Sequence, residues 1–256
     1  MELEIGGKRA LVLGASRGLG MAIAKSLASE GVTVFAAARS HDKIVDWAKG
    51  MDNVHPVQLD LSKLDEVDSV VDTLLKDGGV DIIVNNSGGP PPGTAQAADR
   101  GTWLAHFEAM AANLFHLNTR LLPSMKERKW GRIVSITSSG VEQPIPNLAV
   151  SNGIRGAVVG WSKTLANEVA GDGITVNVVM PGRIHTQRVD ELDAAAAKRT
   201  DTDIADVSAK SRATIPAGRY GKPEEFADVV TFLASQRASY VTGSRIRIDG
   251  GSIKSI

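Results

Sequence analysis

Short apolar runs of strand length alternate along this chain with longer segments whose apolar residues recur at helical spacing. Several of the short runs are rich in valine and isoleucine and lack polar alternation, which is typical of strands covered on both faces. This order predicts βαβ units and a parallel sheet. We expect about seven strands, at Arg9–Leu13, Val32–Ala37, Val54–Leu59, Asp81–Val84, Arg132–Thr137, Thr175–Val179 and Arg245–Ile248.

Helical periodicity fills the spaces between these strands. The clearest helices are expected at Leu19–Ser29 and Leu64–Lys76, and the longest at about Gly101–Lys129 and Ala149–Ala170. The chain has no internal repeat and no linker, so residues 1–256 are expected to form a single domain. The predicted fold class is α/β: a doubly wound parallel sheet of the Rossmann type, with helices on both faces.

Two segments interrupt the alternation. Gly88–Gly93 reads Gly-Gly-Pro-Pro-Pro-Gly, and three consecutive prolines fix φ and remove backbone donors, which excludes regular structure. Residues 183–217 form a long polar segment between the sixth strand and the last helix. Because Asp193–Arg199 favours a helix, we predict a lid-like insertion here. A solvated insertion without function is the alternative.

Composition narrows the function. The chain has 256 residues, 43% hydrophobic and 23% charged, with a formal net charge of zero, which favours neither a nucleic acid nor a membrane as partner. There is no cysteine, and the five histidines lack metal-ligand spacing, so no metal site is expected. No apolar run approaches the ~18–20 residues needed to span a bilayer. A cytoplasmic protein that binds a small-molecule substrate is the prediction.

A glycine-rich turn follows the first predicted strand and opens the first predicted helix. It reads Gly14-Ala15-Ser16-Arg17-Gly18-Leu19-Gly20. Glycines permit a tight turn and let the backbone approach a pyrophosphate, while the helix N-terminus offers unpaired N–H donors and a positive dipole. The strand before and the helix after are the context that this motif requires. The turn is therefore predicted to cradle a dinucleotide.

The spacing of these glycines resembles that of the short-chain dehydrogenase/reductase family. Further likenesses are Asn85-Asn86-Ser87-Gly88 after the fourth strand, Asp60 after the third, Pro181-Gly182 with Thr186 four residues later, and the closing Asp249-Gly250-Gly251. They cover nearly the whole chain and are most like the 3-oxoacyl-carrier-protein reductase branch. The resemblance implies an NAD(P)-dependent oxidoreductase. It also implies a homotetramer or homodimer paired through the two long helices.

The end of the second strand bears on the choice of dinucleotide. A carboxylate there favours a ribose with free hydroxyls, whereas arginine favours a 2′-phosphate. Arg39 ends this strand, and no acid occurs before Asp42. With Arg17, it predicts a preference for NADP(H), and NAD(H) stays an alternative. By resemblance, the cofactor-binding residues are Gly14, Ser16, Arg17, Gly18, Leu19, Gly20, Arg39, Asp60, Leu61, Asn86, Ser87, Gly88, Arg155, Pro181, Gly182, Ile184 and Thr186.

The catalytic positions depart from the family. The resemblance implies a serine, a tyrosine and a lysine near the nicotinamide, and an asparagine in the preceding long helix. Ser138 falls on the serine position, but Ser151 occupies the tyrosine position and Arg155 the lysine position. Met110 stands where the asparagine is expected, with Asn113 one turn later. Serine is a far weaker acid than tyrosine, and arginine does not exchange protons near neutral pH.

Three functions remain open. The first is an NADP(H)-dependent oxidoreductase on a carbonyl or alcohol, in which Ser138 holds the oxygen, Ser151 or water relays the proton and Arg155 stabilises the oxyanion. The second is a catalytically silent dinucleotide-binding protein or the partner subunit of an active relative. The third is a non-redox enzyme on the same fold. Halohydrin dehalogenases resemble this family and carry arginine at the lysine position. They keep the tyrosine, however, and lack the dinucleotide cradle.

Overall fold

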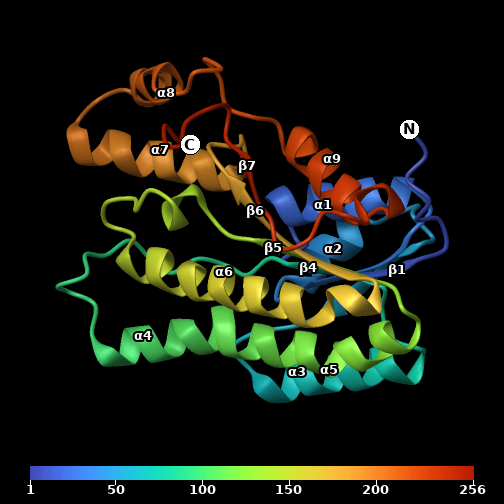
Figure 1. Cartoon of the computed structure of the whole chain (residues 1–256). Helices are drawn as coiled ribbons and strands as arrows, with labels where there is room; N and C mark the ends of the chain where they lie inside the picture. The colour runs from blue at the N-terminus through green and yellow to red at the C-terminus, as the bar shows by residue number, and fades with distance from the viewer.

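Seven parallel strands form one sheet in a computed structural model that describes residues 1–256. The predicted fold class is confirmed, with every strand boundary within two residues of its expected place. The order across the sheet is β3-β2-β1-β4-β5-β6-β7 (Figure 1). The strands are β1 (Arg9–Leu13), β2 (Thr33–Ala38), β3 (Val54–Gln58), β4 (Ile82–Asn85), β5 (Gly131–Ile136), β6 (Ile174–Pro181) and β7 (Arg245–Ile248).

Helices cover both faces, so the sheet has an apolar cluster on each side. One cluster joins the strands to α1 (Gly18–Ser29), α2 (His41–Trp47) and α9 (Pro223–Leu233). The other joins them to α3 (Leu64–Lys76), α5 (Asn113–Glu127) and α6 (Ala149–Val169). Because both faces are buried, the central strands carry unbroken apolar runs, as in Ile82–Val84.

The long helix expected at Gly101–Lys129 is divided into three parts. It consists of α4 (Arg100–Phe107), a π-helical turn at Glu108–Ala112, and α5. A π turn inserts one residue into the helical register. It changes which side chains face α6, and Met110 and Ala111 become buried against Val150 and Ile154.

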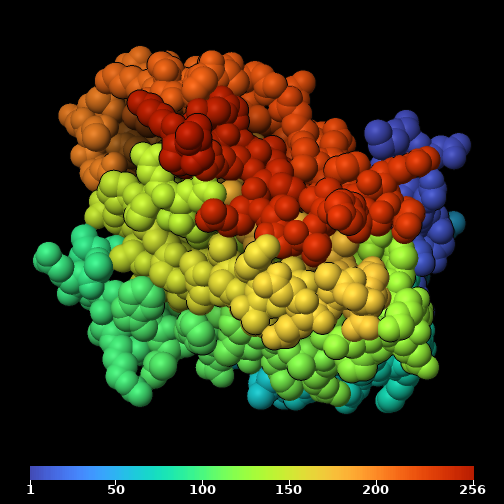
Figure 2. Space-filling view, viewed as in Figure 1, coloured from blue at the N-terminus to red at the C-terminus, as the bar shows by residue number.

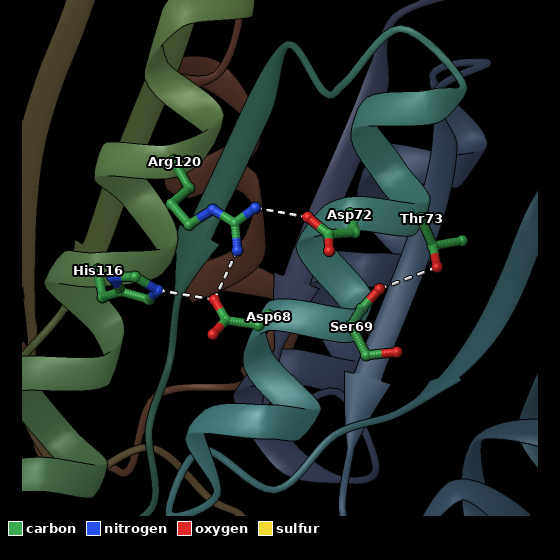
Figure 3. Close-up of polar contacts among 6 residues, drawn as sticks. All are labelled: Asp68, Ser69, Asp72, Thr73, His116 and Arg120. Carbon is green, nitrogen blue, oxygen red and sulfur yellow. Dashed lines mark hydrogen bonds and ion pairs between the residues drawn. The ribbon is translucent and has the colours of Figure 1, made fainter.

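Charged side chains tie α3 to α5 on the outside of the protein. Asp68 accepts hydrogen bonds from His116 and from Arg120, and Arg120 also pairs with Asp72 (Figure 3). Hydrogen bonds from His116 and Arg120 hold the pKa of Asp68 below its ordinary value. All four side chains are at least partly exposed, so this network adds only modestly to stability.

The polar segment at 183–217, which we call the lid, is mostly helical. It contains α7 (Gln187–Thr200) and α8 (Ile204–Ala213), both on the same side of the molecule (Figure 1). The buried carboxylate of Asp193 fastens α7 by accepting hydrogen bonds from Arg183 Nη1 at 3.0 Å and Tyr220 Oη at 2.7 Å. These contacts fix how α7 lies over the ends of the strands.

Strand order reverses between β1 and β4, and β4 is the middle strand of the sheet. In open α/β sheets, ligands bind in the crevice at the carboxyl ends of the strands where the order reverses. The loops after β1 and β4 border this crevice. No helix has the length and apolar character needed to cross a membrane.

Candidate active site

The glycine-rich turn lies at the carboxyl end of β1, where α1 begins. Gly14 has a φ of +63°, and a Cβ built on it would lie 2.5 Å from the carbonyl oxygen of Asn86. A Cβ on Gly20 would lie 2.3 Å from the carbonyl oxygen of Gly14. Asn86 Nδ2 also donates to that oxygen, at 3.4 Å. These contacts explain why glycine is needed and join the turn to the end of β4.

The N-terminus of α1 suits a phosphate group. Its N-cap residue, Arg17, makes no side-chain capping hydrogen bond. The first turn of a helix has N–H groups with no partner inside the helix, so this end presents donors and a positive dipole towards the crevice. Ser16, Gly18 and Leu19, which surround this end, are all half-buried. The cradle therefore fits the pyrophosphate of a dinucleotide.

The two arginines that the sequence singled out differ in their partners. Arg39 follows the last residue of β2, is exposed and forms no ion pair. Its positive charge helps to lower the pKa of Asp60, which follows β3. Arg17 instead donates from Nη1 to Glu191 Oε1 of α7, at 2.9 Å. The sequence singled out both arginines but gave no sign of this acidic partner.

Asp60 and Leu61 lie in the loop between β3 and α3. Asp60 Oδ1 accepts hydrogen bonds from the backbone and hydroxyl of Ser62. Partial burial opposes its ionisation, but the bonds from Ser62 lower the pKa of Asp60 below its ordinary value. The carbonyl oxygen of Leu61 accepts a hydrogen bond from Asn113 Nδ2 at 2.8 Å. The loop is therefore anchored to α5.

The loop after β6 passes over the cradle on its way to α7. Gly182 runs so close to β7 that a Cβ would lie 2.6 Å from Asp249 Cα. Ile184 is buried and pairs with Gly221. Thr186 is the N-cap residue of α7, and its methyl carbon would lie 3.5 Å from a Cβ on Gly18. The structure thus brings Thr186, at the end of this loop, to the glycine-rich turn.

Arg155 contacts one of the two predicted catalytic serines and the end of the strand that precedes the other. Its Nε donates to Ser151 Oγ at 3.3 Å, one turn earlier on α6, and its Nη1 donates to the carbonyl oxygen of Ile136 at 3.1 Å. Ser138 follows Ile136 by two residues, and its Oγ accepts from Gly140 N at 3.0 Å. Each serine uses an acceptor position in these bonds, so its O–H hydrogen stays free to donate.

The environment of Arg155 sets its protonation. Burial lowers the pKa of Arg155 to about 10, so the guanidinium is still charged at neutral pH. Arg155 takes part in no ion pair, and a Cβ built on Gly89 would lie 3.9 Å from its Nη2. Such a permanent, uncompensated charge stabilises a developing oxyanion but does not exchange protons with it.

The family asparagine has no polar substitute at Met110. Met110 is 4% exposed and packs in an apolar cluster with Val150, Ile154 and Val158. Asn113, one turn later, donates its side-chain hydrogen bond to the carbonyl oxygen of Leu61. Neither tyrosine takes the place of Ser151, because Tyr220 donates to Asp193 and Tyr240 is fully exposed.

The proline-rich loop after β4 meets the loop that precedes α6. Gly93 N donates to the carbonyl oxygen of Asn147 at 2.7 Å, and Ala149 N donates to that of Gly93. Glu142, which lies between β5 and α6, forms ion pairs with Arg245 and Arg247 of β7. Among the 256 residues, no group of three or more metal-ligating side chains occurs.

Comparisons with known proteins show the family. A family model described as enoyl-(acyl carrier protein) reductase matches residues 14–252. The 3-oxoacyl-[acyl-carrier-protein] reductase of Vibrio cholerae is 35% identical over 261 aligned positions, which cover 98% of each protein. An uncharacterised oxidoreductase of Bacillus subtilis, YvrD, is 31% identical over the full length of both.

Solved structures of reductases have the same fold. L-sorbose reductase from Gluconobacter frateurii, complexed with NADPH and L-sorbose, superimposes with a TM-score of 0.94 at 32% identity and 100% coverage of both chains. YwfH, an NADPH-dependent reductase involved in bacilysin biosynthesis, gives a TM-score of 0.92 at 29% identity, covering 97% of this chain and 99% of its own. The chain belongs to the short-chain dehydrogenase/reductase family of oxidoreductases.

Proposed function

We propose that this protein is an NADP(H)-dependent oxidoreductase that interconverts a carbonyl and an alcohol without a catalytic tyrosine. The observation that carries the proposal is the fork of Arg155, which holds Ser151 and reaches the end of β5 beside Ser138. The cradle at Gly14–Gly20 supports dinucleotide binding. NADPH-bound reductases of the same fold support NADP(H) as the cofactor.

The chemistry divides between the dinucleotide and the chain. When bound, the cofactor supplies the hydride that is added to the carbonyl carbon. Ser138 donates its O–H to the carbonyl oxygen, and Arg155 stabilises the negative charge that develops there. Ser151 passes its proton to this oxygen and regains one from water. Because Ser151 accepts a hydrogen bond from a cation, its hydroxyl is a better acid than an isolated serine.

A catalytically silent dinucleotide-binding protein, or the partner subunit of an active relative, is the second candidate. Two hydrogen bonds favour this second candidate: Tyr220 donates to Asp193, and Asn113 donates to the carbonyl oxygen of Leu61. Neither side chain can therefore substitute for the tyrosine and the asparagine that the family uses for proton transfer. Both candidates require the cradle. They differ only in whether carbonyl substrates are reduced.

We also propose a homodimer or homotetramer paired through α5 and α6. Phe115 and Trp161 stack across these helices with ring centroids 4.5 Å apart, and both are only partly buried. Figure 2 shows α5 (green) and α6 (yellow) uncovered on one face of the molecule. A half-buried aromatic pair on two neighbouring surface helices is suited to burial against a second copy.

Calorimetric titration with NADPH and NADH tests the cofactor. An exposed arginine that contacts a phosphate contributes about 1.4 kcal/mol, so Arg39→Ala should weaken NADPH binding about tenfold. NADH binding should not change, because its ribose lacks the phosphate. Arg199→Ala removes an exposed arginine from the lid and serves as the control. Equal losses for NADPH and NADH would contradict the reading of the 2′-phosphate by Arg39.

A further inference from the structure

A carboxylate of the lid, that of Glu191, forms an ion pair with Arg17, one of the two arginines of the cradle. Glu191 lies in α7, 174 residues from Arg17, and its Oε1 accepts from Arg17 Nη1 at 2.9 Å. Its other oxygen is 3.7 Å from Arg188 Nη1. The hydrogen bond from Arg17 holds the pKa of Glu191 below its ordinary value. Glu191 is therefore ionised at neutral pH.

Other contacts hold α7 in this position. Asp193, two residues further along, is 4% exposed and accepts hydrogen bonds from Arg183 and Tyr220. At the N-terminal end of α7, the methyl group of Thr186 lies over Gly18. Because α7 is anchored on both sides of Glu191, the carboxylate stays near the cradle whether or not Arg17 is free.

The two cradle arginines are thus unequal. Arg39 forms no ion pair, although its charge acts on Asp60, whereas Arg17 is paired with Glu191. A 2′-phosphate that contacts Arg17 has to displace a carboxylate of the same sign of charge. A ribose with free hydroxyls meets no such competition, and a hydroxyl can donate to a carboxylate.

We propose that Glu191 is a specificity-determining residue for the dinucleotide, because its carboxylate competes with the 2′-phosphate of NADP(H) for Arg17. The inference rests on the proposed function, in which a dinucleotide binds at the cradle. Glu191 moderates the preference for NADP(H) that the two arginines create. It also makes the contact between α7 and the cradle sensitive to the phosphate.

Glu191→Gln tests this competition, since glutamine has the same shape and no charge. Asp190→Asn is the matched control, because Asp190 is the adjacent exposed acid of α7 and pairs with His185 rather than with Arg17. The probes are NADPH and NADH, together with the fragments 2′,5′-ADP and 5′-AMP. Trp47 donates to the carbonyl oxygen of Ala15 in the cradle, so tryptophan fluorescence offers a signal for binding.

Glu191→Gln is expected to tighten binding of NADPH and 2′,5′-ADP about two- to fivefold, the range for a partly exposed ion pair. Binding of NADH and 5′-AMP should not tighten, and Asp190→Asn should change none of the four. In an Arg17→Gln background, the effect of Glu191→Gln should disappear.

Three results would overturn the inference alone: equal tightening for phosphorylated and unphosphorylated probes, weaker NADPH binding, or an effect that persists without Arg17. The last result would show that Glu191 acts through the lid and not through Arg17. Failure of the wild-type protein to bind any of the four probes would overturn the proposed function and this inference together.

Discussion

Arg155→Lys tests whether Ser151 and Arg155 act as one unit. Lysine keeps the positive charge but carries a methylene group where arginine carries Nε. The variant therefore loses the donor to Ser151 Oγ, while its ammonium group can still reach towards the carbonyl oxygen of Ile136. The variant therefore separates the effect of the positive charge from the effect of the hydrogen bond to Ser151.

The expected loss follows from the geometry of that one bond. A hydrogen bond to a charged group contributes about 1.5–3 kcal/mol. The distance of 3.3 Å between Nε and Oγ is long for such a bond, so the lower end applies. About 1.4 kcal/mol in the barrier is a factor of ten in rate. We expect kcat to fall about tenfold in Arg155→Lys, and ~10²–10³-fold in Arg155→Met, which also removes the charge.

The assay is kcat and KM for a carbonyl substrate, with the dissociation constant of NADPH measured separately. Ser151→Ala completes a double-mutant cycle. If the hydrogen bond carries the effect, Arg155→Lys should change kcat less than twofold once Ser151 is alanine. Losses that simply multiply in the double variant would refute the reasoning. So would a kcat in Arg155→Lys equal to that of the wild type.

Asp193→Ala should lower the free energy of unfolding by about 2 kcal/mol by denaturant titration, since two donors lose a buried acceptor; Asp206→Ala, on exposed surface, is the control, and equal losses would contradict the anchoring role. Asp68→Asn should lower Tm at neutral pH, because hydrogen bonds from His116 and a neighbouring arginine depress the pKa of Asp68. That stabilisation exists above the ordinary carboxyl pKa and vanishes as pH falls through the lowered one, so the difference in Tm should shrink below about pH 4; a constant difference would contradict it. Trp161→Glu should convert the oligomer to monomers in sedimentation equilibrium, and a wild-type monomer would exclude pairing through α5 and α6.

The sheet was predictable because its central strands are buried on both faces. Runs such as Ile82–Val84 have no polar alternation, and turns with glycine or asparagine punctuate them. The helix α2, by contrast, was not predicted. It has seven residues, of which only Ile44 is buried, so its periodicity is too short to read. The π turn at Glu108–Ala112 was also not predicted, because one inserted residue barely changes the spacing of apolar residues along the helix.

Only those residues of the site that belong to recognisable motifs could be predicted from the sequence. The glycine-rich turn, Ser138, Ser151 and Arg155 stand at positions that the resemblance implies, and Arg155 joins Ser151 to the end of β5, two residues before Ser138. No motif indicates that Asp193, in a polar segment, becomes buried. The pairing of Arg17 with Glu191 is equally invisible, because 174 residues separate them and only the packing of the lid brings them together.

Oxidation of NADPH, followed at 340 nm with a panel of ketones, 3-oxoacyl thioesters and ketoses, tests the central claim most directly. The account predicts turnover by the wild-type protein, although it has no tyrosine beside Arg155. The double variant Ser151→Tyr with Arg155→Lys restores the family pair and serves as the comparison. If the wild-type protein binds NADPH but reduces no member of the panel, while the double variant does, the native site is a silent one and the proposed function is wrong.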